Sequence, residues 1–343
     1  MKHLLNTLFV TTEDVYLTLE GENVVANRGN DKVARYPLHT LQNIVTFSYA
    51  GASPALMGAC SEKNVNITFC TPNGKFLARI TDVRNGNVLL RREQYRIADD
   101  SNRSALIGRN MIFGKLYNSR WCLERGLRDH KDRVNQNVLV CSIEALKTDL
   151  KQVRMIDTVE SIMGVEGAGA TAYFRAFDQL LLRDKDFFFF DKRTRRPPLD
   201  RINAMLSFSY SILVSECASA LESVGLDAYV GFLHQDKPGR KSLALDIMEE
   251  LRSCYADRFV ITAVNNRIIQ PDDFLTAESG AVRMTDDGRK KFLKAWQERK
   301  QDTITHPFLK EKMKWGLVPY IQSLLLARHI RGDLDEYPPF LWK

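Results

Sequence analysis

One short stretch of the chain, residues 231–252, places a histidine ahead of a helix-patterned run that carries three carboxylates. In chain order they are His234, Asp246, Glu249 and Glu250. The acids interrupt an apolar pattern of helical period, and Asp246 and Glu249 share one helix face because they are three residues apart. A Pro-Gly pair at 238–239 lets the chain reverse and bring His234 to that face. Such residues can hold a metal ion, whereas a solvated acidic stripe with a histidine at a helix end is the simpler interpretation.

A further carboxylate stands alone in a glycine-rich segment. Glu166 is the only charged residue within 161–174, and glycines occupy positions 164, 167 and 169. Glycine lets another backbone or a ligand approach closely. We expect a helix over 168–181, which would place Glu166 at or near its N-terminus, as a capping acid or as a ligand. One imidazole and mostly carboxylate ligands, with no cysteine nearby in a thiolate pattern, suit Mg²⁺ or Mn²⁺ better than structural zinc.

Four sequence blocks resemble a known family. They are GVEGAGATAYF at 164–174, RRPPLDRINAMLSFSY at 195–210, GLDAYVGFLH at 225–234 and GRKSLALDIMEELR at 239–252. In this order they are similar to the universal CRISPR-associated integrase, in particular its type I-C branch, which captures foreign DNA as new spacers. The likeness spans nearly the whole chain. It rests on a series of blocks and not on one short pattern, so it is specific.

The resemblance implies a set of site residues. Glu166, His234 and Glu249 would hold a divalent metal, Mg²⁺ or Mn²⁺, and Asp246 would lie beside the metal as a further catalytic residue. Whether Asp246 or Glu250 also touches the metal stays open. Helical phase favours Glu249 over Glu250, because Glu250 is rotated by about 100° away from the face that Asp246 and Glu249 share.

The elements that must position these residues change in character near residues 84–100. Period-two patterns predict strands at 7–12, 15–20, 23–27, 32–36, 43–47, 66–70 and 75–80, with turns at 21–22, 29–30 and 73–74 and one helix at 54–63. Helical periodicity then predicts helices at 88–96, 101–125, 132–162, 168–183, 199–224, 242–253, 271–275, 286–301 and 306–330.

These patterns predict an α+β multidomain protein, with a small β-rich N-terminal domain followed by a large all-α catalytic domain. The resemblance implies the same architecture. Residues 1–90 would form the β-rich domain and mediate dimerisation, and residues 91–343 would form the all-helical domain that binds metal and DNA.

Composition agrees with a folded cytoplasmic protein, and the resemblance implies that its source is a prokaryote. The 343 residues are 44% hydrophobic, which supports a sizeable core. Six cysteines form no CxxC pair, and no secretory signal or apolar run of transmembrane length is seen, so we expect structural thiols in a reducing compartment and no membrane association. The net charge is +7, and residues 1–90 carry 8 Lys/Arg against 7 Asp/Glu, so six of the seven net positive charges follow residue 90. Such an excess suits a phosphodiester substrate, although many proteins carry one.

Several basic groups are candidates for DNA contact. The turn between His234 and the acidic helix carries Lys237, Arg240 and Lys241, and a proline-containing loop carries Arg193, Arg195 and Arg196. Arg175 follows Glu166 along the same predicted helix. A fourth group on the predicted helix 101–125 and just beyond it comprises Lys115, Arg120, Arg125 and Arg128. Tyr117, Trp121 and Leu123 of the same segment favour a core role over base stacking. Each basic group also has a plain interpretation as a solvated surface.

The resemblance implies phosphoryl transfer on double-stranded DNA. A DNA 3′-hydroxyl would attack a phosphodiester of the repeat array, so that a prespacer is inserted as a new spacer. The family acts as a homodimer with a small dimeric CRISPR-associated adaptation partner, and some systems add a RecB-type exonuclease. Two alternatives stay open: a metal-dependent structure-specific DNA nuclease that integrates nothing, and a non-catalytic DNA-binding scaffold.

Overall fold

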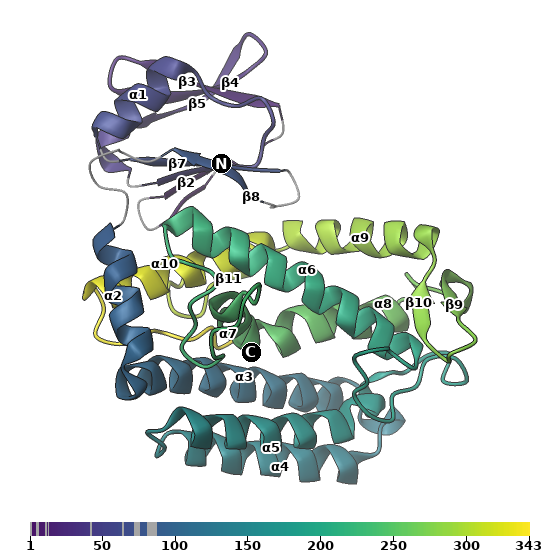
Figure 1. Cartoon of the computed structure of the whole chain (residues 1–343). Helices are drawn as coiled ribbons and strands as arrows, with labels where there is room; N and C mark the ends of the chain where they lie inside the picture. Colours follow the sequence, from purple (N-terminus) through teal and green to yellow (C-terminus); the bar gives the residue numbers. More distant parts are fainter. Residues whose placement is uncertain are drawn as a thin grey trace.

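The computed structural model describes residues 2–4, 7–10, 12, 14–41, 43–63, 65–71, 76–80 and 88–343. The β-rich N-terminal part lies on one side of a larger helical part, and Figure 1 shows α6 running beneath the N-terminal strands. The fold class predicted from the sequence, β-rich first and then largely helical, is confirmed. Among the described residues the last N-terminal strand ends at Ile80 and the next helix begins at Val88, so the predicted domain boundary near residue 90 stays a prediction.

Two sheets make up the N-terminal part. The first has the order β1-β2-β6-β7-β8, from Lys2–Leu4, Thr7–Val10, Asn43–Thr46, Asn66–Cys70 and Phe76–Ile80, with β2, β6 and β7 parallel. The second is the antiparallel series β3-β4-β5, from Val15–Glu20, Asn23–Arg28 and Asp31–Pro37. Helix α1, Pro54–Glu62, begins after the cap Ser53. The predicted turns at 21–22 and 29–30 are present, with Gly21 and Gly29 at positive φ, whereas the predicted turn at 73–74 lies outside the described residues.

The first sheet is buried on both faces. Along β2, Leu8 and Val10 belong to the core between the two sheets, whereas Phe9 belongs to the core of the helical part. This alternation follows from the period of two in a strand. Phe9 also packs edge-on against Tyr320 of helix α10, with ring centroids 6.1 Å apart. The N-terminal sheet is therefore seated directly on the helical part.

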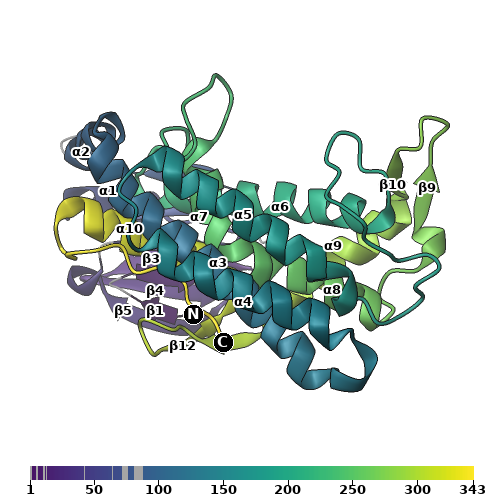
Figure 2. The ribbon, with the colours of Figure 1, turned by 90° about the horizontal axis from the view of Figure 1, so that it is seen from below.

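The helical part is built around the long helix α3, Ser101–Asp129, which packs against α4, α5 and α7 (Figures 1 and 2). The other helices are α2 Val88–Asp99, α4 Gln136–Val153, α5 Val159–Phe177, α6 Arg201–Val224, α7 Ser242–Leu251, α8 Arg258–Asn265, α9 Asp286–Gln301 and α10 Val318–Arg331. A π-helical segment, Arg252–Asp257, joins α7 to α8. Side chains cap several N-termini, among them Asp100 before α3 and Thr158 before α5.

Among the described residues, one helix is long and apolar enough to span a membrane by length and composition. It is α6, and 61% of its apolar window is buried inside the protein. A window buried to that extent is what the core helix of a folded domain shows, so the helix carries no argument for a membrane.

Some predicted helices differ from the structure. Two hairpins interrupt the helical part: β9 Phe274–Thr276 with β10 Val282–Met284, and β11 Thr303–Thr305 with β12 Lys312–Lys314. The helix predicted at 271–275 is therefore a short 3-10 turn leading into β9, and the helix predicted from 306 begins only at Val318. The predicted helix 132–162 is divided between α4 and the start of α5.

Candidate active site

Two of the predicted ligands share one cation. The ammonium group of Lys115 on α3 contacts the Glu166 carboxylate from α5 and lies 2.6 Å from the Glu249 carboxylate of α7. The Glu249 side chain is 5% exposed and that of Glu166 is 18% exposed, so the group opens to solvent on the side of Glu166. Three helices that are far apart in sequence thus converge on one buried cluster of charge.

Glu166 lies in the interior of a helix, so the expectation that it stands at or near a helix N-terminus was wrong. Helix α5 begins at Val159 and is capped by the Thr158 hydroxyl, which accepts from Ser161 N. Gly169 serves packing, because a Cβ there would lie 2.2 Å from Leu116 Cδ2 on α3. Glu166 is therefore not a capping acid.

The charge on Glu249 is strongly stabilised. Burial by itself would raise the pKa of this carboxyl, but Arg252 and Lys115 outweigh burial and lower the pKa to about 2. Arg252 is the first residue of the π-helical segment, and its Nη2 lies 2.8 Å from Glu249 Oε1. His234 also contributes, less than these two cations, to the lowering of the Glu249 pKa.

The imidazole of His234 is held by Asp246. Its Nδ1 lies 2.6 Å from Asp246 Oδ1, and the backbone N–H groups of Phe232, Leu233 and His234 donate to the same carboxylate at 2.6, 3.0 and 3.1 Å. Asp246 is fully buried, so these four contacts occupy its two oxygens. Within the described part of the chain, His234 Nε2 makes no hydrogen bond. Asp246 therefore orients the imidazole and leaves the other ring nitrogen available.

Gly231 allows this arrangement. A Cβ at this position would lie 2.8 Å from Asp246 Oδ2 and 2.9 Å from the His234 carbonyl oxygen. These distances are shorter than ordinary contacts between heavy atoms, so a side chain would push the 231–234 loop away from α7.

Glu250 belongs to a different network. Its carboxylate accepts hydrogen bonds from the Tyr337 hydroxyl, from Gln322 Nε2 at 3.0 Å and from Phe340 N at 2.8 Å. Burial raises the pKa of Glu250 to about 7. Glu250 thus anchors the C-terminal segment against α7 and α10 and points away from Lys115 and Glu166, in line with the helical phase that favours Glu249.

The side chains of Glu166, Glu249 and His234 are donors that suit a divalent cation, although they do not form a ready-made metal cluster. In the part of the chain that the structure describes, no three His, Cys, Asp or Glu side chains form a ready-made metal cluster. The reason is visible at Lys115, whose ammonium lies between Glu166 and Glu249. Two carboxylates that already share a cation, beside an imidazole with one nitrogen oriented by a carboxylate, match the chemistry of a hard-metal site.

Five of the residues predicted to contact DNA lie on two loops. Lys237 is exposed, and Arg240 and Lys241 are half-buried, on the loop between His234 and α7. Arg195 and Arg196 are exposed on the loop before α6. These five side chains make no ion pair with any residue that the structure describes.

Arg193 and Arg175, the other two residues predicted to contact DNA, are less favourably placed to do so. Arg193 is held by the fold, because its guanidinium donates to Asn203 Oδ1 at 2.7 Å and to Ser207 Oγ at 2.9 Å and lies over the Tyr210 ring. Arg175 is nine residues after Glu166 on α5, which turns it about 180° away from that carboxylate. The structure therefore does not bring Arg175 to the acidic cluster.

Sequence reasoning did not identify Lys115 and Arg252 as members of the site. Lys115 lies on a face of α3 whose other members, Met111, Ile112 and Leu116, are buried apolar residues. A lysine on such a face needs a carboxylate partner, and this requirement could have marked Lys115 as a member of a charged site. Arg252 could also have been predicted from the sequence as a partner of Glu249, because it follows Glu249 by three residues.

A third residue beside this group, Tyr210 of α6, was also missed. Arg252 lies over its ring, and its hydroxyl donates to Asp257 at 2.6 Å. Burial raises the pKa of Asp257 to about 6. No pattern in the sequence around Tyr210 marks it, because its partners come from the π-helical segment between α7 and α8.

Comparison with known proteins finds relatives over the whole length of the chain. The family described as "CRISPR associated protein Cas1" matches residues 8–298. The chain is 46% identical over 343 residues to "CRISPR-associated endonuclease Cas1 1" of Chlorobaculum tepidum, covering 100% of both chains. Among solved structures it is similar to "Casposase bound to integration product" (TM-score 0.80, 21% identity, 99% and 100% of the two chains). It is also similar to "Partial Cas6-RT-Cas1--Cas2 complex" (TM-score 0.77, 22% identity, 98% of each chain).

Proposed function

The chain belongs to the family of CRISPR-associated Cas1 proteins, and on that premise we propose that it is a divalent-metal-dependent DNA endonuclease and integrase of CRISPR adaptation. A full-length relative at 46% identity is named an endonuclease. Two proteins of similar fold are described as bound to an integration product and as part of a complex with Cas2. These descriptions support the proposal that the chain inserts short foreign DNA duplexes as spacers into the repeat array. Its assignment to the type I-C branch stays a prediction.

One observation carries the proposal. Glu166 and Glu249, from two separate helices, converge on a single cation beside a histidine whose ring is fixed by Asp246. The side chains of Glu166, His234 and Glu249 would hold Mg²⁺ or Mn²⁺. When bound, a divalent ion supplies Lewis-acid polarisation of a phosphate and stabilises charge on the departing oxygen.

The remaining groups serve binding and charge. A DNA 3′-hydroxyl attacks the phosphorus of a repeat phosphodiester, a new P–O bond forms, and the bond to the departing 3′-oxygen breaks. Lys115 and Arg252 place two positive charges beside the carboxylates, so that a phosphate entering this group meets compensating charge. Asp246 positions His234 without offering a free oxygen of its own. The loop with Lys237, Arg240 and Lys241 adjoins His234 and can contact the DNA backbone.

Assembly forms part of the same proposal. The Cas2-containing complex of similar fold supports partnership with a small dimeric adaptation protein. Homodimer formation through residues 1–90, a RecB-type exonuclease partner and a cytoplasmic location are further parts of it, and they rest on the family resemblance.

A plasmid assay separates integration from its alternatives. A supercoiled plasmid with a leader and one repeat is mixed with a short DNA duplex bearing free 3′-hydroxyls, with Mg²⁺ or Mn²⁺ and with EDTA. We expect metal-dependent covalent joining of the duplex to the repeat. Metal-dependent nicking without joining would mean the structure-specific nuclease instead, and metal-independent binding without turnover would mean a DNA-binding scaffold.

Substitutions then test the residues. Glu166→Ala, His234→Ala and Glu249→Ala should each abolish joining while circular dichroism and the midpoint of thermal unfolding show a folded protein. Glu144→Ala, an exposed acid on α4 that pairs with Lys147, is the matched control and should join DNA normally. Full activity of His234→Ala would overturn the assignment of the site.

A further inference from the structure

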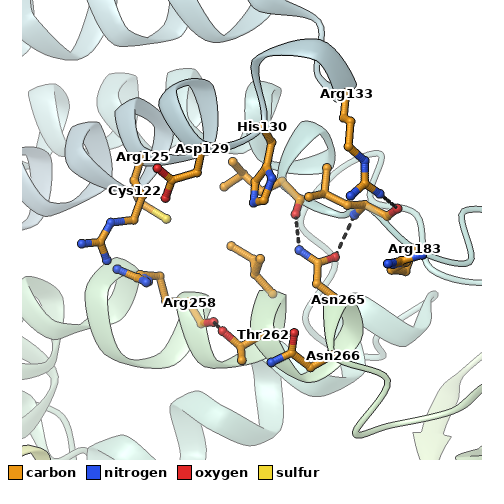
Figure 3. A pocket seen from close by; sticks show the side chains of 14 residues that line it. Cys122, Arg125, Asp129, His130, Arg133, Arg183, Arg258, Thr262, Asn265 and Asn266 are labelled. Atoms are coloured by element: carbon orange, nitrogen blue, oxygen red, sulfur yellow. Dashed lines mark hydrogen bonds between the residues drawn. The ribbon is translucent and has the colours of Figure 1, made fainter.

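A second polar hollow lies between the C-terminal end of α3, helix α8 and the segment 180–183 (Figure 3). Its volume is about 350 Å³. Its ionisable lining is almost entirely basic: Arg125, Arg133, Arg183, Arg258 and His130 against one acid, Asp129. In Figure 3, Arg125 and Arg258 flank the hollow on one side and Arg133 and Arg183 on the other. The hollow contains none of the predicted metal ligands, and of the basic residues considered above for DNA contact it contains Arg125 alone.

The single acid does not neutralise the arginines. Asp129 is engaged by Arg128, whose Nε donates to its carboxylate at 2.8 Å, and this hydrogen bond lowers the pKa of Asp129. Within the described ranges, the guanidinium groups of Arg125, Arg183 and Arg258 make no hydrogen bond or ion pair with protein. Burial lowers the pKa of Arg258, and the nearby charge of Arg125 acts in the same direction.

The two inner arginines are held in position by an aromatic ring. The guanidinium carbon of Arg125 lies 4.9 Å from the Trp342 ring centroid, and that of Arg258 lies 4.6 Å from it. Cation–π contacts of this kind orient a guanidinium without using its N–H donors. Both side chains therefore keep their hydrogen-bonding capacity for a ligand.

The rim of the hollow is built rigidly. Asn265 donates to the Leu180 carbonyl at 2.9 Å and accepts from Leu182 N at 2.8 Å, and Arg133 donates to the Leu182 carbonyl at 2.8 Å. A Cβ at position 126 would lie 2.3 Å from Leu180 Cδ2, so glycine at this position lets the segment lie close against α3. A pre-formed rim reduces the entropy that a ligand must overcome.

We propose that this hollow binds a phosphate group of a DNA strand, at a site separate from the metal centre. Guanidinium groups with free donors bind phosphate oxygens in a paired geometry, and an uncompensated cluster of them attracts a polyanion. Arg125 lies ten residues beyond Lys115 on α3, which separates the two sites by about 15 Å along the helix. That span equals about four base-pair steps of a duplex strand. The identity of the ligand rests on the proposed function, because DNA is the substrate of that function.

Binding of DNA without metal tests the site. The full chain in EDTA is titrated into a short fluorescently labelled duplex over a series of salt concentrations. For the double variant Arg125→Gln/Arg258→Gln, DNA affinity at ~0.1 M salt should fall about tenfold for each phosphate that the variant no longer binds. The slope of log affinity against log salt concentration should flatten by about one for each such phosphate. Arg92→Gln/Arg331→Gln, which removes two exposed arginines outside the hollow, is matched for charge and should change affinity less than threefold.

A second variant guards against a folding defect. Arg183 is exposed and makes no hydrogen bond or ion pair within the described ranges, so Arg183→Gln should leave the unfolding midpoint unchanged while weakening DNA binding in the same direction. Unchanged DNA affinity and salt slope in both variants would overturn the proposal.

Two further experiments complete the test. The first distinguishes free phosphate from DNA as the ligand of the hollow, and the second distinguishes this proposal from the proposed function. Calorimetric titration with inorganic phosphate and with dAMP detects binding of free anions. If the hollow variants lose that binding but keep their DNA affinity, a DNA strand is not the occupant and the inference fails. The joining assay with Glu166→Gln reports on the metal site alone. Loss of metal-free DNA binding in the hollow variants, together with a wild type that neither cuts nor joins, would overturn the proposed function and leave the DNA-binding hollow standing.

Discussion

His234 and Asp246 are joined twice, through the imidazole Nδ1 at 2.6 Å and through the backbone N–H at 3.1 Å from the same Asp246 oxygen. The second oxygen of Asp246 accepts the N–H groups of Phe232 and Leu233. One buried carboxylate thus fixes both the path of the loop and the orientation of the ring. The family resemblance places Asp246 beside the metal, and this geometry gives it a role as a positioning residue.

Asp246→Asn tests that role. An amide keeps the size of the side chain but replaces one acceptor oxygen by a donor, so it cannot accept all four hydrogen bonds. We expect the metal concentration that gives half-maximal DNA joining to rise about 10- to 100-fold. The free energy of unfolding should fall by about 2 kcal/mol through weaker hydrogen bonds to the loop. Metal titrations of the joining reaction and urea unfolding measure the two effects.

The comparison with His234→Ala separates positioning from direct binding. His234→Ala should lose joining at every metal concentration, whereas Asp246→Asn should recover part of it at high metal. A normal metal response of Asp246→Asn would show that the carboxylate does not orient the ring.

Lys115 gives a prediction for the protein without metal. Its ammonium is the cation shared by Glu166 and Glu249, and removing it leaves two carboxylates facing one another. Lys115→Met should lower the free energy of unfolding in EDTA by about 3 kcal/mol, because one partner of a buried ion pair is removed. Mn²⁺ should then raise the unfolding midpoint of the variant more than that of the wild type, since a bound cation relieves the repulsion.

Differential scanning fluorimetry with and without Mn²⁺ checks this prediction. Lys147→Met, which removes an exposed lysine that pairs with Glu144, is the control and should behave like the wild type. A smaller stabilisation by Mn²⁺ in Lys115→Met than in the wild type would contradict the idea that ammonium and metal share the same carboxylates.

Gly231 gives a prediction of purely steric origin. Gly231→Ala puts a methyl group within 3 Å of Asp246 and of the His234 carbonyl, so the loop must shift. We expect at least a tenfold loss of joining and a destabilisation of about 1–3 kcal/mol from overpacking. Gly164→Ala on α5 meets no atom within 4 Å and should stabilise the protein by up to about 1 kcal/mol. Equal behaviour of the two variants in joining and in urea unfolding would refute the steric argument.

Much of the fold could be predicted from local patterns in the sequence. The strands follow a period of two between turns with glycine at positive φ, and Asp246 and Glu249 were placed on one face by helical spacing alone. These features depend only on neighbours within a few residues. The position of Asp246 beside a metal stays a prediction, whereas the structure shows its four hydrogen bonds to the 232–234 backbone and to the His234 ring.

What the sequence did not reveal depends on contacts between distant segments. Lys115 meets Glu166 and Glu249 only after α3, α5 and α7 have packed together. The glycines around Glu166 suggested a helix start, whereas the structure has them inside α5, where Gly169 packs closely against Leu116. The hairpin β11–β12 occupies residues whose apolar spacing also suits a helix. Tertiary packing overrode local preference at these places.

Glu250 predicts the pH dependence of stability. Burial raises its pKa from 4.5 to about 7, so its contribution is fully present below pH 4.5 and is lost as the pH rises toward and beyond 7. Glu250→Gln keeps a neutral group of the same shape. Between pH 4.5 and pH 8 it should therefore gain up to about 3 kcal/mol in unfolding free energy relative to the wild type, in addition to a constant, pH-independent cost of the acceptor oxygen that the amide replaces.

Urea unfolding of both proteins between pH 4.5 and 8 measures this difference. His306 acts in the opposite direction, because burial lowers its pKa to about 4 and stability from that group is lost as the pH falls from 6.5. Both proteins contain His306, so the difference between them isolates Glu250. Glu144→Gln, at an exposed acid, should track the wild type at every pH. A stability difference between wild type and Glu250→Gln that stays constant from pH 4.5 to 8 would mean that Glu250 does not change its charge state in this range.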